Sequence, residues 1–86
     1  MNKRKLVDYT SMYEALATLM KTELPEVELY FEIGRAVCAR PEKGAAVMAA
    51  EHLQASCPES KGFSPRNLRR MREFYRAYAD SRELQA

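Results

Sequence analysis

The sequence predicts an all-α fold, a small bundle of about four helices whose last two form a helix-turn-helix-like pair. The chain of 86 residues has no Trp and only 3 Gly and 4 Pro, a composition that favours helices over sheets. Apolar residues recur at helical spacing in four segments separated by turn residues. The length fits one small domain, expected at residues 11–80 between a basic tail at 1–10 and a second tail at 81–86.

The first helix is predicted to begin near Ser11. Ser11 and Glu14 have the S-x-x-E spacing of a capping box, in which two side chains satisfy free N–H groups at the helix start. Pro25 is expected to end this helix or to open the next, because the residue before a proline disfavours the α region. One helical face is apolar and consists of Met12, Leu16, Leu19 and Met20.

The second helix is predicted over residues 25–40. Pro25 fits a first helical position, and Glu26 and Glu28 suit the positive end of the helix dipole. Gly34 inside this helix should cost roughly 1 kcal/mol relative to alanine. A close approach by another helix would explain this glycine, and simple tolerance is the alternative. The apolar surface is wide and consists of Val27, Tyr30, Phe31, Ile33, Val37 and Cys38.

The third helix is predicted over residues 45–56, after a break at Pro41 and Gly44. It is rich in alanine, and its slim face permits close packing by neighbouring helices. That face consists of Ala46, Ala49, Ala50 and Leu53.

The fourth helix has the clearest predicted start. Ser64 is a good N-cap and Pro65 falls at the first helical position. Phe63 before the cap and Leu68 in the second turn can form a hydrophobic staple. On a helical wheel the apolar side chains occupy about 80° to 220° and the arginines about 240° to 40°. The predicted core residues of this segment are Phe63, Leu68, Met71, Phe74, Tyr75 and Tyr78.

The arginine face is the strongest candidate for a functional surface. Arginine is permanently charged, and its planar fork matches phosphate and the major-groove edge of guanine. Asn67 could pair with adenine, and Lys61 lies beside the same helix end. The expected nucleic-acid-binding residues are Lys61, Arg66, Asn67, Arg69, Arg70 and Arg76, with Lys3, Arg4 and Lys5 as candidate helpers. Arg72 lies nearer the core boundary, where it can pair with an acid.

The charge distribution also permits an interpretation without nucleic acid. The net charge is +2, but residues 8–60 carry −5 and residues 61–86 carry +4. The arginines could be an ordinary solvated face paired with Glu73 at helical spacing and with acids of the second helix. Alternatively, the acidic second helix of one copy could pack against the basic fourth helix of another.

Enzymatic and metal chemistry are not expected. His52 is the only histidine and has no catalytic partner on its helix face, since neighbours in sequence do not face each other. Cys38 and Cys57 lack ligand spacing, and Cys57 has no adjacent base. We therefore expect no enzyme, no cofactor and no bound metal. The absence of a signal peptide or membrane span favours a cytoplasmic protein with reduced thiols.

Two stretches resemble the amino-terminal domain of the YhcG-like PDDEXK nuclease family. LYFEIGR at 29–35 resembles its aromatic-rich helix, and KGFSPRNLRRMREFYRAY at 61–78 resembles its second motif without a gap. Phe31 stands where Trp is usual, and Lys43–Gly44 where Trp-Gly is usual. The family's carboxyl-terminal nuclease domain is not in this sequence. The resemblance therefore implies the helical domain, with DNA binding or protein assembly as its role, and not cleavage.

The expectation from the sequence is a non-catalytic DNA-binding module that uses the arginine face. The connection Cys57–Gly62 is longer than the turn of a simple helix-turn-helix, which argues against docking like that of simple repressors. Beside DNA, the candidate partners are a second copy and a separate nuclease subunit. The alternative is an assembly module without nucleic-acid contact, and a third interpretation is a fragment or remnant of a longer nuclease.

Overall fold

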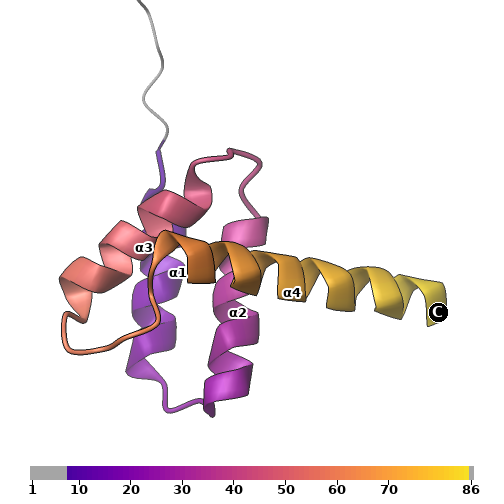
Figure 1. Cartoon of the computed structure of the whole chain (residues 1–86), viewed down its shortest axis with the longest axis horizontal. Coiled ribbons are helices and arrows are strands. Elements are labelled where there is room, and N and C mark those ends of the chain that lie inside the picture. The colour runs from indigo at the N-terminus through magenta and orange to yellow at the C-terminus, as the bar shows by residue number, and fades with distance from the viewer. Residues whose placement is uncertain (1–7, 86) are drawn as a thin grey trace, which may run out of the picture.

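The computed structural model describes residues 8–85, with side chains described through residue 81. It contains α1 (Thr10–Lys21), α2 (Glu26–Cys38), α3 (Ala45–Ser56) and α4 (Pro65–Gln85), and no strand occurs in this part of the chain (Figure 1). The all-α prediction is confirmed. α3 has the predicted bounds, whereas α4 continues to Gln85 through the segment expected as a tail.

The start of α1 differs from the predicted capping box. Tyr9 precedes the first helical residue, and the carboxylate of Asp8 accepts a hydrogen bond of 2.9 Å from the backbone N–H of Thr10. Ser11 therefore lies inside the first turn and cannot be the N-cap. The prediction is wrong because Asp8, two residues before Thr10, already supplies a charged acceptor for the helix start.

Prolines explain where α2 begins and ends. Pro25 is the residue before the helix, with ψ of 153°, and not its first helical residue. α2 ends at Cys38, short of the predicted Arg40, because Arg40 precedes Pro41 and is disfavoured in the α region. The Arg40 guanidinium instead binds both carboxylate oxygens of Glu42 at 3.1 Å and lies 5.1 Å from the ring centroid of Tyr9.

The core lies where the four helices meet. The predicted alanine face of α3 is fully buried, which brings its neighbours close to the α3 backbone. No polar or charged residue is buried within the part of the chain that the structure describes. Phe63 and Leu68, the predicted staple, both belong to the core. Its largest fully buried side chains are Leu16, Ile33, Val37, Leu53, Leu68 and Met71.

α2 and α4 make the most extensive helix contact, and Gly34 lies at its closest point. A Cβ atom at position 34 would lie 2.7 Å from the carbonyl carbon of Met71 and 3.2 Å from the Cβ of Tyr75. Only a residue without a side chain fits there. The close approach, and not simple tolerance, therefore explains this glycine.

Phe74 and Tyr78 are not core residues, contrary to the prediction. Their exposed fractions are 49% and 47%, while Tyr75 is half-buried. Tyr30 and Phe31 of α2 are also only half-buried, and Val27 is 70% exposed. The reason is that α4 crosses α2 and runs on beyond the other helices (Figure 1), so that Phe31 of α2 contacts these two side chains but leaves them about half-exposed.

Candidate nucleic-acid interface

The first turn of α4 is held by a compact set of hydrogen bonds. The hydroxyl of Ser64 accepts a bond of 3.2 Å from the backbone N–H of Asn67, which confirms Ser64 as the N-cap. Gly62 has φ of +92°, a conformation that favours glycine, and its carbonyl accepts a bond of 3.2 Å from the Asn67 side-chain amide. Gln54 of α3 donates to the carbonyl of Phe63 at 2.9 Å. The loop and the helix start are therefore fixed to each other and to α3.

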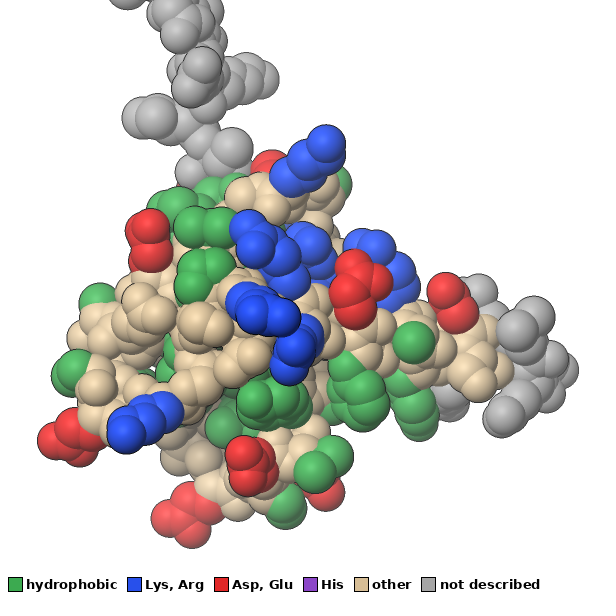
Figure 2. Space-filling model, viewed as in Figure 1, with side chains coloured by type: hydrophobic (Ala, Val, Ile, Leu, Met, Phe, Trp, Pro, Cys, Tyr) green, Lys and Arg blue, Asp and Glu red, His purple; other side chains and the backbone are tan. Residues whose placement is uncertain are grey.

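Three arginines project from this anchored start. Arg66, Arg69 and Arg70 are exposed, and none has an acidic partner within 4 Å among the residues that the structure describes. Figure 2 shows Lys and Arg side chains gathered over the first half of α4. We call Arg66, Arg69 and Arg70 the basic face. The α2 glutamates do not neutralise it, because the one ion pair described on α2 joins Glu32 to Arg35 at 3.7 Å.

Arg72 and Arg76 of α4 are partly compensated by Glu73. Its carboxylate lies 3.4 Å from Arg76 and 4.0 Å from the Nε atom of Arg72. The Arg72 side chain is only 18% exposed, and its buried Nε atom has no hydrogen-bond partner among the described residues. Arg76 is exposed. Arg76 therefore contributes less uncompensated charge than the basic face does.

Lys61 and Asn67 lie at the same end of the helix as the basic face. Lys61 is exposed, whereas Asn67 is half-buried and its amide nitrogen is bound to Gly62. The assignment of these residues to nucleic-acid binding stays a prediction. Lys3, Arg4 and Lys5 lie outside the described residues.

The histidine and the two cysteines, the other candidates for catalysis or metal binding, form no such site among the described residues. His52 stacks on Tyr13 with ring centroids 4.5 Å apart, so its ring joins α3 to α1. Cys38 and Cys57 are half-buried free thiols. Among the described side chains of residues 8–81, no three His, Cys, Asp or Glu side chains are grouped so that they could hold a metal ion. No helix in this range has the length and hydropathy that a membrane crossing needs.

Comparison with models of known protein families identifies the family of this chain. The family model described as the DUF1016 N-terminal domain matches residues 10–86 and so spans all four helices. The chain belongs to this family. The match confirms the resemblance to the amino-terminal region of YhcG-like proteins. No curated protein and no solved structure matches the chain.

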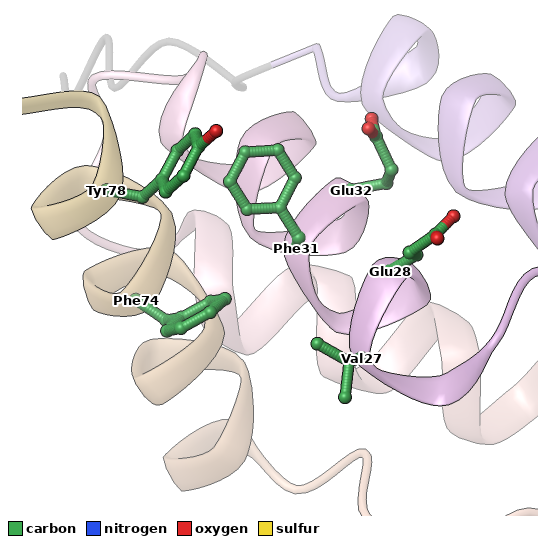
Figure 3. A pocket seen from close by; sticks show the side chains of 6 residues that line it. All are labelled: Val27, Glu28, Phe31, Glu32, Phe74 and Tyr78. Carbon is green, nitrogen blue, oxygen red and sulfur yellow. The ribbon is translucent and has the colours of Figure 1, made fainter. Parts of the chain in front are cut away.

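This DUF1016 N-terminal domain has a second exposed surface, which includes the Phe74 and Tyr78 side chains predicted as core. Figure 3 shows Phe74 and Tyr78 of α4 facing Val27 and Phe31 of α2 across an open pocket of about 360 Å³. Phe31 contacts Tyr78 and Phe74 edge-on, with ring centroids 4.9 and 6.2 Å apart. We call Val27, Phe31, Phe74 and Tyr78 the apolar groove.

A signal for the apolar groove existed in the helical wheel of α4. Phe74 lies at about 80°, at the edge of the apolar arc and next to Arg70 at about 40°. A side chain at such an edge is buried only where a neighbouring helix reaches it. In this DUF1016 N-terminal domain α2 reaches one side of Phe74, and no described element covers the other.

Proposed function

We propose that this DUF1016 N-terminal domain is a non-catalytic DNA-binding module and that the basic face of α4 contacts the phosphate backbone. One observation supports this proposal most directly. Three exposed arginines project from an anchored helix start without any acidic partner in the described part of the chain. Uncompensated arginines attract phosphate and displace its counterions, which favours binding to a duplex of any sequence.

The state of Asn67 supports backbone contact over base reading. A bidentate contact with adenine requires both the amide donor and the carbonyl acceptor of an Asn side chain. In this chain the amide nitrogen already donates to the Gly62 carbonyl, which orients the side chain toward the loop. The second N–H of the amide could still donate to adenine, but only with the half-buried side chain held in this orientation. We therefore propose binding with little sequence preference.

The length of the connection between α3 and α4 also favours binding to the phosphate backbone. The helices are separated by residues 57–64, more than the three or four residues that join the helices of a simple helix-turn-helix. A docking mode like that of simple repressors is not required by the proposal. The basic face needs only to lie along one strand of phosphates.

The salt dependence of DNA binding tests the proposal. Each phosphate contact contributes about −0.9 to the slope of log K against log salt concentration. Replacing Arg66, Arg69 and Arg70 by Gln should therefore reduce the slope by about 3 and weaken low-salt binding strongly. The matched control is Arg35→Gln, an exposed arginine of α2 that pairs with Glu32. Fluorescence anisotropy with labelled duplexes of two unrelated sequences gives both quantities. Absence of low-salt binding, or a slope that survives the triple substitution, contradicts the proposal.

Assembly without nucleic acid is the second candidate function. The apolar groove favours it, because exposed aromatic side chains beside each other are typical of protein-binding surfaces. The groove and the basic face use different residues of α4. Substitutions at Val27 or Phe74 therefore test assembly without removing a residue of the basic face.

A further inference from the structure

The outer side of α4 carries one continuous ridge with two kinds of side chain. Arg66, Arg70, Phe74 and Tyr78 are spaced four residues apart, so they follow one another along the same helix surface. The first two are exposed cations. The last two are half-exposed aromatics that form one wall of the apolar groove.

The opposite wall of the groove belongs to α2 and is rimmed by acids. Glu28 and Glu32 line the same pocket as Val27 and Phe31 (Figure 3). Glu28 is exposed and forms no hydrogen bond or ion pair with any described residue. Glu32 has a distant pair with Arg35 at 3.7 Å. The groove therefore suits an apolar helix surface that is flanked by basic side chains.

The ridge of α4 has this chemistry itself. We infer that the apolar groove binds the α4 helix of a second copy of this chain, with the two α4 helices antiparallel and Phe74 of each near the two-fold axis. In this arrangement Arg70 of one copy lies opposite Tyr78 of the other, beside the acids that line the groove. Each contact then occurs twice, as a closed two-fold interface requires.

Charge complementarity selects a second copy over an unrelated helix. The groove supplies Glu28 and Glu32. The ridge supplies Arg70 and Arg66, which lie one and two turns before Phe74, the aromatic residue that enters the groove. An arginine opposite a tyrosine ring adds a cation–π contact. Both halves of the interface are present on every molecule, so no further component is needed.

The exposed area indicates a weak, concentration-dependent dimer. Each half-exposed aromatic side chain contributes roughly 100 Å², and Val27 adds a similar amount, so each copy offers roughly 300 Å² of apolar surface. Two copies would bury roughly 600 Å² of it, which is less than the apolar part of a standard interface of about 1,600 Å². The flanking charges then matter, and the dimer should weaken as salt rises.

Sedimentation velocity without nucleic acid tests the inference. Between about 10 μM and 1 mM protein at low salt, the chain should shift from monomer to dimer, the range typical of weak interfaces. Val27→Asn and Phe74→Ala should each raise the dissociation constant about tenfold or more. Thr18→Asn, on the exposed side of α1, is the control for Val27→Asn and should change nothing. Circular dichroism verifies that each variant remains folded.

A charge exchange gives a sharper test. Arg70→Glu should abolish the dimer by placing acid against acid, and combining it with Glu28→Arg and Glu32→Arg should restore it. A chain that stays monomeric up to about 1 mM overturns the inference and leaves the groove to a different polypeptide. A dimer that is insensitive to Val27→Asn and Phe74→Ala also overturns it.

The dimer and the DNA proposal can fail independently. The dimer is measured without DNA, and DNA binding is measured at protein concentrations where the chain is monomeric. Val27→Asn should leave the salt slope of DNA binding unchanged, since this side chain is not on the basic face.

Discussion

Replacement of Gly34 by alanine should destabilise the domain, although alanine is the better helix former. In an open helix this change would stabilise by about 1 kcal/mol. Here the new Cβ atom would lie against the backbone carbonyl of Met71, 2.7 Å from its carbon atom, and 3.2 Å from the Cβ of Tyr75. Ordinary contact begins near 3.4 Å. α2 and α4 must therefore separate by about 1 Å or deform.

The size of the effect follows from what this separation disturbs. Ile33 and Val37 of α2 and Leu68 and Met71 of α4 are fully buried in the same core, and their packing loosens when the helices move apart. Overpacking of a core typically costs about 1–3 kcal/mol and occasionally more. Here the obstacle is backbone and cannot change rotamer, so we take the cost as about 3–4 kcal/mol. Subtracting the gain in helix propensity leaves about 2–3 kcal/mol. For a domain of this size the melting temperature should fall by about 10–20 °C.

Thermal and urea unfolding followed by circular dichroism measure this loss. Gly44→Ala is the matched control, because a Cβ atom there would meet only the Tyr9 hydroxyl oxygen at 3.7 Å and the backbone has φ of −79°. Its stability should change by less than about 1 kcal/mol. A Gly34→Ala variant as stable as the original chain would refute the reasoning, because α4 could then shift at no cost.

Three further predictions concern single interactions at the helix starts. Ser64→Ala should cost about 1 kcal/mol in unfolding free energy, because it removes the hydroxyl that accepts the Asn67 N–H, and Ser60→Ala in the same loop is the control. Asn67→Ala should lower the free energy of unfolding by about 0.5–1.5 kcal/mol even without DNA, through loss of its bond to Gly62; unchanged stability in urea would contradict this role. Hydrogen bonds from Thr10 lower the pKa of Asp8. The stability that Asp8 contributes is therefore present above its unfolded pKa near 4 and is lost as the pH falls through the folded pKa. Asp8→Asn should lessen the acid sensitivity of the melting temperature, and a pH profile identical to that of the original chain would contradict this.

Local signals predicted most of the fold from the sequence. The α3 bounds and the Ser64 cap follow from side chains that act on their own segment, namely small apolar residues at helical spacing and a hydroxyl before a proline. The sequence also offered the correct explanation for Gly34. A glycine inside an amphipathic helix costs helix stability, and close packing of another helix backbone is one gain that offsets this cost. Such signals require no knowledge of where the other helices lie.

The errors arose where distant elements decide the outcome. Phe74 and Tyr78 have the hydrophobicity of core residues, but their burial depends on how much of α4 the other helices cover. The start of α1 was a local error instead, because Asp8, three residues before Ser11, supplies an acceptor that the capping-box pattern does not include. For the candidate site, the exposure of the basic face was predictable from its spacing. The absence of acidic partners for Arg66, Arg69 and Arg70 among the described residues was not, since it depends on where α2 carries its glutamates.

The contact at Gly34 has a genetic consequence. The atoms that a larger residue would strike first are the backbone carbonyl atoms of Met71, which every amino acid possesses. No substitution at position 71 removes them, so a defect at position 34 cannot be suppressed by a compensating change in the nearest residue. Second-site substitutions that restore stability should instead replace the buried alanines of α3 or residues of the α3–α4 connection. Changes at these positions let the whole of α4 shift away from position 34. The pattern of second-site revertants would thus reveal which parts of the domain move as one body.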